Sequence, residues 1–192
     1  LTIHETCHGL AAYALGDPTA KRAHRLSLNP LRHIDWLGLI MMVVAGFGWA
    51  KPVPVDPRYF KKPKQGMAIT ALAGPVSNFL LALVLLLIAR GVYLRALVTG
   101  QLSEVWFSFL LNTASLSVGL GLFNLVPIPP LDGSKVLAVL LPDRAYSWLM
   151  RYERFGMLLL LAVISVGIGS NALDSAIRWT FTLLCRLVGF EV

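Results

Sequence analysis

Long uncharged hydrophobic stretches dominate the chain, and shorter basic segments separate them. A hydrocarbon core of about 30 Å needs roughly 17–25 mostly apolar residues in one helix. Residues 67–89 and 105–126 meet this requirement without a charge, and both are predicted to cross a membrane. Residues 155–170 are apolar but shorter, and residues 1–15 form only half a span. Because that half-span needs residues upstream of Leu1, we expect the N-terminus to be truncated.

Residues 36–50 form a further apolar segment that is too short for a comfortable crossing and has basic flanks. Gly46, Gly48, Pro52 and Pro54 follow one another closely, which predicts that the second half of this segment is extended. Non-helical backbone at membrane depth needs protein or a water-filled cavity to satisfy its polar groups. The pattern therefore predicts a re-entrant, β-like loop beside a cavity.

The C-terminal residues 171–190 carry apolar side chains on one helical stripe, and Asp174 and Arg178 have the i, i+4 spacing expected for an ion pair. This segment is predicted either to lie at the membrane interface or to form a last span. The whole pattern predicts an all-α polytopic membrane protein with about four to six membrane helices and the re-entrant loop. With no internal repeat or soluble linker, residues 1–192 are expected to form a single domain.

Composition and charge agree with a membrane protein. Hydrophobic residues make up 56% and charged residues 14%, and the mean hydropathy is +0.69, against roughly 45–50% apolar and about 25% charged in soluble domains. The net charge of +7 does not indicate nucleic-acid binding, because Lys and Arg flank the spans. Segments 16–66 and 132–154 hold thirteen Lys and Arg, whereas segment 90–104 holds two. The first two segments are therefore predicted to be cytoplasmic and the third to lie outside.

His4, Glu5 and His8 form the pattern HExxH. Side chains four residues apart on a helix share a face, so both imidazoles can direct a nitrogen at one zinc ion. Glu5 then lies beside a metal-activated water, where a carboxylate serves as general base. The alternative is a pair of helix-surface histidines, but ionisable groups in an apolar helix are costly and usually functional. Cys7, inside the motif, fits a small buried thiol better than a ligand.

A catalytic zinc ion keeps about three protein ligands, so one more is needed. Asp132 is the best candidate, because the predicted topology places it on the same side of the membrane as the end of the first helix. An aspartate before Gly133 also fits an ordinary turn. However, Pro127, Pro129 and Pro130 prevent a regular helix there, so unwound backbone is expected beside a cavity.

Three other polar residues have open roles. His33 is a second-shell or gating candidate, although a solvated position at the membrane interface is favoured. His24, between Arg22 and Arg25, is expected at the surface. Asn124 could hydrogen-bond a ligand carboxylate or the substrate backbone, or satisfy a freed carbonyl of its own chain.

Four segments resemble the site-2 protease family, whose zinc-dependent members cut substrates within or next to the membrane. They are HETCH (4–8), GFGWAKPVPV (46–55), AGPVSN (73–78) and NLVPIPPLDG (124–133). The resemblance assigns zinc to His4, His8 and Asp132, the acid/base role to Glu5, and substrate contacts to Asn124, Gly46, Phe47 and Gly48. It also implies that the glycine-containing loop holds the substrate as an added strand.

The resemblance is to a minimal member of the family. Segment 90–104 is too short to hold a PDZ domain, and nothing after residue 155 resembles a soluble domain such as a CBS domain. Segment 16–66 is therefore expected to be the cytoplasmic and re-entrant region that binds substrate. The expected location is a prokaryotic cytoplasmic membrane, crossed several times.

These features together predict a zinc-dependent intramembrane endopeptidase. Its expected partners are transmembrane protein substrates and the lipid bilayer, with no nucleic acid. The main alternative is a non-proteolytic metal-binding membrane protein, such as a pseudoprotease or a metal carrier. Glu5 separates the two, because metal binding does not need it and hydrolysis does. A soluble zincin fragment is disfavoured by the uncharged spans.

Overall fold

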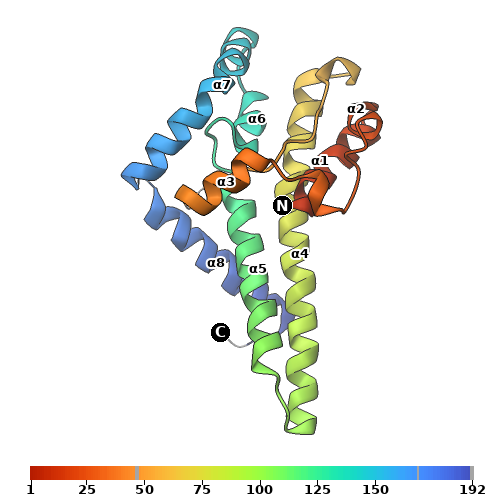
Figure 1. Ribbon diagram of the computed structural model, residues 1–192, viewed down its shortest axis with the longest axis vertical. Coiled ribbons are helices and arrows are strands. Elements are labelled where there is room, and N and C mark those ends of the chain that lie inside the picture. Colours follow the sequence, from red (N-terminus) through yellow and green to blue (C-terminus); the bar gives the residue numbers. More distant parts are fainter. Residues whose placement is uncertain (46–47, 168, 191–192) are drawn as a thin grey trace.

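The computed structural model describes residues 1–45, 48–167 and 169–190 (Figure 1). Across these ranges the chain is helical and contains no strand, apart from an isolated antiparallel bridge between Ile34 and Ala50. The helices are α1 (Thr2–Ala14), α2 (Thr19–Arg22), α3 (Trp36–Ala45), α4 (Pro63–Thr99), α5 (Glu104–Asn124), α6 (Asp132–Ala138), α7 (Asp143–Val166) and α8 (Ser170–Val188), with 3₁₀ turns η1 (Pro30–Arg32) and η2 (Pro57–Tyr59). The prediction of an all-α protein is confirmed.

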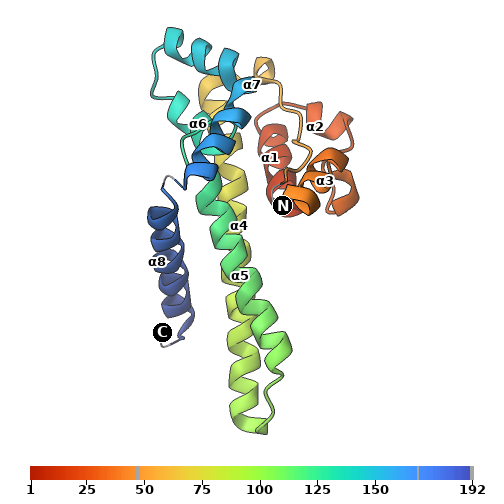
Figure 2. The same cartoon turned by 60° about the vertical axis from the view of Figure 1, so that its left-hand side comes forward.

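Helices α4 and α5 form a long hairpin that is the axis of the molecule (Figures 1 and 2). Pro63 is the first residue of α4, where its lack of an N–H costs nothing because the first N–H groups of a helix have no partner within the helix. Gly100 ends the helix with a φ of 70°. Small side chains let the helices approach closely. The buried cluster between α4, α5 and α8 consists of Ala82, Leu86, Ala114, Val118 and Cys185.

Two of the described helices, α4 and α5, are long and apolar enough to cross a membrane. A third candidate span is Phe155–Val166 together with Ser170–Val188, which are bent by 88° relative to each other. The protein is therefore a membrane protein with two or three candidate spans in the described ranges. The larger number of four to six membrane helices, and the re-entrant loop, stay predictions.

Helix α8 lies against the hairpin, and Figure 2 shows it alongside α5. The apolar stripe predicted from the sequence is the face that makes this contact. Ile177, Phe181, Leu184 and Val188 of that stripe pack on the buried cluster of the hairpin. The stripe is thus covered by the chain's own helices.

Helices α1 and α6 both pack on α4 (Figure 1), which brings the two ends of the predicted site together. Partly buried hydrogen bonds join segment 16–66 to α1 and join the two ends of the segment to each other. The Asp17 carboxylate accepts a hydrogen bond from the Asp56 N–H at 2.7 Å, and the Thr6 hydroxyl donates to the Ser27 carbonyl at 2.9 Å. These contacts fix the segment beside the histidine helix.

The segment from residue 36 divides as predicted into a helical first half, α3, and a non-helical stretch over residues 48–56. A Cβ on Gly48 would overlap the carbonyl oxygen of Gly38, so this glycine is required by the chain's own packing on α3. Gly48 thus lies against a backbone of the same chain, and close approach of a substrate backbone at this glycine stays a prediction. Gly46 and Phe47 lie outside the described residues.

Candidate metal centre

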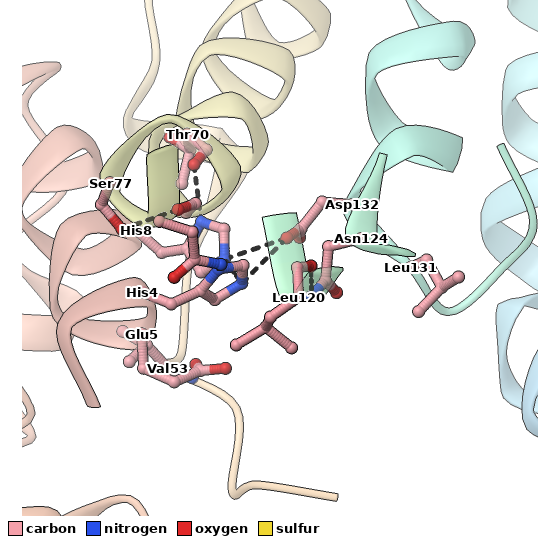
Figure 3. Close-up of polar contacts among 12 residues, drawn as sticks. His4, Glu5, His8, Val53, Thr70, Ser77, Leu120, Asn124, Leu131 and Asp132 are labelled. Carbon is pink, nitrogen blue, oxygen red and sulfur yellow. Dashed lines mark hydrogen bonds and ion pairs between the residues drawn. The ribbon is translucent and has the colours of Figure 1, made fainter. Parts of the chain in front are cut away.

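His4 and His8 lie one turn apart on α1, and both side chains are buried. Figure 3 shows the two imidazoles pointing toward the same place. The rings meet edge to face with centroids 4.5 Å apart, and their Nε2 atoms are 3.0 Å apart. The shared helical face predicted from the spacing of the two histidines is thus the observed one.

Asp132 is the first residue of α6 and is also buried. Its Oδ2 atom lies 3.1 Å from the His4 Nε2 and 3.2 Å from the His8 Nε2. The carboxylate therefore completes a compact group of three potential metal ligands. Among the described residues, this is the one group of such side chains close enough together to hold a metal ion. The unwound, proline-rich segment after α5 brings Asp132 back to the histidines, as Figure 3 shows.

The three ligand atoms fit a zinc ion. Zinc takes nitrogen and oxygen ligands at about 2.0–2.1 Å in a tetrahedron, whose edges are then about 3.3–3.4 Å. The observed edges of 3.0, 3.1 and 3.2 Å match that triangle closely. The Asp132 Oδ2 is buried and has no hydrogen-bond partner, which is a costly arrangement unless a cation satisfies it.

Proton positions agree with metal binding. The His8 Nδ1 lies 2.7 Å from the Thr70 carbonyl oxygen, which only accepts, so Nδ1 carries the proton and Nε2 presents its lone pair. An aspartate side chain is ordinarily ionised at neutral pH, so Asp132 would supply an anionic ligand.

Outer contacts to the histidines come from one face of α4. Thr70 faces His8, and the Asn78 amide lies 3.0 Å from the His4 Nδ1. A His4 ring that gives Nε2 to a metal carries its proton on Nδ1, so it donates to the Asn78 carbonyl oxygen once the amide is turned to present it. Such partners fix the ring orientation and raise ligand basicity.

Gly74 lies between these two residues and has no space for a side chain. A Cβ there would overlap the His8 Cε1 and lie 2.6 Å from the His4 Cε1. The roles of Thr70, Gly74 and Asn78 were missed from the sequence, although AGPVSN was noted as a family segment. Their signal is the i, i+4, i+8 spacing of polar and small residues in an uncharged span.

Glu5 follows His4 on α1 and lies outside the triangle of ligand atoms. Its Oε2 accepts a hydrogen bond from the Val53 N–H at 3.1 Å. This contact joins the carboxylate to the non-helical segment after α3. Glu5 is thus held beside the histidines by α1 and oriented by Val53.

A cavity of about 670 Å³ contains the site. His4, Glu5, His8 and Asp132 line it, together with Gly48 and Asn124. The Asn124 amide donates to the Leu120 carbonyl at 2.9 Å, so it satisfies its own helix, one of the predicted alternatives. The predicted cavity beside the loop is present, and contact of Asn124 or Gly48 with a substrate stays a prediction.

His24, His33 and Cys7 are not part of this group of ligand atoms. The preference for a solvated His33 is wrong, because the residue is 3% exposed and its Nε2 lies 2.7 Å from the Ser27 carbonyl oxygen. The reason is that the segment folds back on itself, with the His33 carbonyl accepting from the Lys51 N–H at 2.9 Å. His24 is exposed as expected, and Cys7 is half-buried.

Comparisons with known proteins give one family. The family model described as "Peptidase family M50" matches residues 1–166, a range that includes His4, Glu5, His8 and Asp132. No solved structure gives a significant match.

Three curated relatives are zinc metalloproteases by name. The chain is 40% identical over 180 residues to "Putative zinc metalloprotease YwhC" of Bacillus subtilis (strain 168), covering 90% of this chain and 79% of that protein. It is 29% identical over 196 residues to Rip2 of Mycolicibacterium smegmatis, covering 100% of this chain and 70% of Rip2. It is 37% identical over 76 residues to "Zinc metalloprotease RasP" of Oceanobacillus iheyensis, covering 34% of this chain and 18% of RasP.

Proposed function

The chain belongs to peptidase family M50 and is a zinc metalloprotease, and we propose that it cleaves membrane-embedded substrates with Glu5 as general base. In this proposal His4, His8 and Asp132 hold the zinc ion. The observation that carries it is the convergence of three buried ligand atoms from α1 and α6 in the wall of a cavity that also contains Glu5.

Zinc, when bound, supplies Lewis acidity that lowers the pKa of a water and polarises the scissile carbonyl. Glu5 takes a proton from that water while the water oxygen bonds to the carbonyl carbon. Glu5 then delivers the proton to the amide nitrogen as the C–N bond breaks, which leaves a carboxylic acid and an amine. The Val53 N–H holds Oε2, and within the described contacts Oε1 has no hydrogen-bond partner, so it is the oxygen available for the proton.

The segment after α3 is the proposed site of substrate pairing. The bridge between Ile34 and Ala50 uses one edge of this segment, and Gly48 and Ala50 also line the cavity. A substrate helix hides its amides in its own hydrogen bonds, so it must unwind before cleavage. Pairing with the second edge would replace some of those bonds, although Pro52 and Pro54 have no N–H to donate.

The decisive test is the variant Glu5→Gln in purified protein reconstituted into liposomes with a model transmembrane substrate. We expect zinc content equal to the wild type and cleavage reduced by about 10²–10⁴-fold, the usual contribution of a general acid–base group. Glu104→Gln, which removes an exposed carboxylate from the first turn of α5, is the matched control and should cleave normally. Unchanged cleavage by Glu5→Gln would defeat the assigned role.

The alternative of a metal-binding protein without protease activity predicts another outcome. Zinc would again bind to the wild type and to Glu5→Gln, but neither would release product from any membrane substrate. Glu5 would then have no catalytic role in the cavity, and its contact with Val53 would be structural. The same liposome assay therefore separates the two functions.

A further inference from the structure

A second pocket, distinct from the metal cavity, lies where the basic segment meets the start of α3. Its volume is about 570 Å³, and it is lined by residues 23–25, 31, 32, 34–37 and Lys51. Arg25, Arg32 and Lys51 bring three permanent positive charges, against the single carboxylate of Asp35. The pocket is therefore suited to an anion.

The central observation is the buried environment of Arg25. The residue is only 7% exposed, and its Nη2 donates to the Lys51 carbonyl oxygen at 2.5 Å. The Nε is buried without a hydrogen-bond partner, and in the described part of the chain no carboxylate lies within ion-pair distance of Arg25. A buried guanidinium without an anion is costly, and its donor fork matches phosphate geometry.

Arg32 and Lys51 are the other two cationic residues that line the pocket. Arg32 is exposed and uses its Nη1 on the His24 carbonyl oxygen at 2.7 Å. Lys51 is exposed, and among the contacts of the described residues only its backbone groups take part in hydrogen bonds. The Asp35 carboxylate caps the start of α3, because its Oδ1 accepts a hydrogen bond from the Gly38 N–H at 3.0 Å. The balance of charge facing the pocket is positive.

Apolar side chains adjoin these cations. Leu31, Trp36 and Leu37 line the same pocket and are exposed, with Trp36 at 69% and Leu37 at 61%. Further along α3, Ile40, Val43 and Val44 are also exposed. In a membrane protein an exposed tryptophan between a basic segment and an apolar helix is typical of the level of the lipid headgroups.

We propose that this pocket binds the phosphate of an anionic phospholipid headgroup, with the acyl chains along Trp36 and Leu37. The pocket would recognise the phosphate anion, a group that free inorganic phosphate also presents. The bound lipid would contact Lys51, whose neighbours Ala50 and Pro52 line the metal cavity. Lipid binding needs no step of the proposed hydrolysis, so each proposal can fail without the other.

Native mass spectrometry of the detergent-solubilised full chain tests the proposal. The probes are dioleoyl phosphatidylglycerol, dioleoyl phosphatidylcholine and inorganic phosphate, each titrated separately. The double variant Arg32→Gln/Lys51→Gln removes two exposed cations of the pocket. Lys61→Gln/Lys62→Gln removes two exposed cations from the same basic segment outside the pocket and so has the same net charge. Zinc content of each variant reports that the fold is intact.

We expect the wild type to bind one phosphatidylglycerol more tightly than phosphatidylcholine. The Arg32→Gln/Lys51→Gln variant should bind it at least about tenfold more weakly, since each cation near an anionic headgroup contributes a severalfold factor. The control variant should change by less than about twofold. Arg25→Gln should weaken binding at least as much, and it is judged only if its zinc content is normal.

The relative affinities for phosphatidylglycerol and inorganic phosphate distinguish the two sources of the phosphate group. Phosphatidylglycerol binding at far lower concentration than inorganic phosphate identifies a lipid site, and equal affinities identify a site for free phosphate in place of the lipid. The proposal is overturned if phosphatidylcholine binds as well as phosphatidylglycerol, or if the control variant loses as much affinity as the pocket variant.

Discussion

Gly74 of α4 lies directly against His8 of α1, and a Cβ on residue 74 would overlap the Cε1 atom of that imidazole. The same Cβ would come within 2.6 Å of the His4 Cε1. The two rings therefore occupy space that α4 leaves open by having no side chain at this position. Close packing of α1 on α4 is what turns a helical histidine pair into a defined metal site.

Gly74→Ala should weaken zinc binding by at least about tenfold, because the added methyl group must push both imidazoles away from Asp132. Alanine is the better helix former, so α4 itself should gain stability by about 0.5–1 kcal/mol relative to glycine. Zinc affinity of the purified protein, measured by competition with a chelator, checks the prediction. Gly91→Ala on the same helix is the control, since a Cβ there has nothing within 4 Å. Equal zinc affinity in the two variants would contradict the steric argument.

Asn78→Leu should lower zinc affinity by about 10–100-fold, the usual cost of losing an outer partner of a metal-bound histidine. Asn78→Asp should retain more affinity, because a carboxylate accepts a hydrogen bond from the His4 Nδ1–H. The same chelator competition measures both variants, with Asn112→Leu at an exposed position of α5 as the control. Similar losses for Leu and Asp would show that Asn78 acts through packing and not by orienting His4.

Asp132→Asn should reduce zinc affinity by more than about a hundredfold, beyond what outer partners contribute, because it removes the anionic ligand while keeping the side-chain volume. Metal analysis of the purified protein provides the measurement. Asp174→Asn, an exposed position on α8, should retain full zinc content. Full zinc content in Asp132→Asn would show that the carboxylate is not a ligand.

Val53→Pro should reduce cleavage by about tenfold while leaving zinc content unchanged. The change removes the N–H that donates to the Glu5 Oε2, and hydrogen bonds to charged groups are worth about 1.5–3 kcal/mol. Val53→Ala keeps that N–H and should cleave faster than Val53→Pro. Single-turnover cleavage in liposomes is the appropriate measurement, and equal rates for the proline and alanine variants would rule out an orienting role for this contact.

The local part of the site could be predicted from the sequence. A helix places residues four apart on one face, so the HExxH pattern alone determined that His4 and His8 share a face with Glu5 beside it. Hydropathy likewise indicated the uncharged stretches 67–89 and 105–126, which lie largely within α4 and α5, because apolar length is a property of consecutive residues. The break before Asp132 followed from three prolines that cannot continue a helix.

Contacts between distant segments could not be predicted in this way. Asp132 is the favoured third ligand from the sequence, but only the packing of α1 and α6 on α4 places its carboxylate beside the imidazoles. The burial of His33 depends on a segment folding back on itself, which no periodicity records.

What the sequence by itself determined is therefore the chemistry of the donors, their helical spacing and the membrane character of the chain. The tertiary structure alone decided that the Asp132 carboxylate meets two imidazoles, that Thr70, Gly74 and Asn78 of α4 surround them, and that Val53 orients Glu5. The physical reason is that spacing along a helix is set by local backbone geometry, whereas these contacts join residues far apart in sequence and arise only when packed helices bury them together.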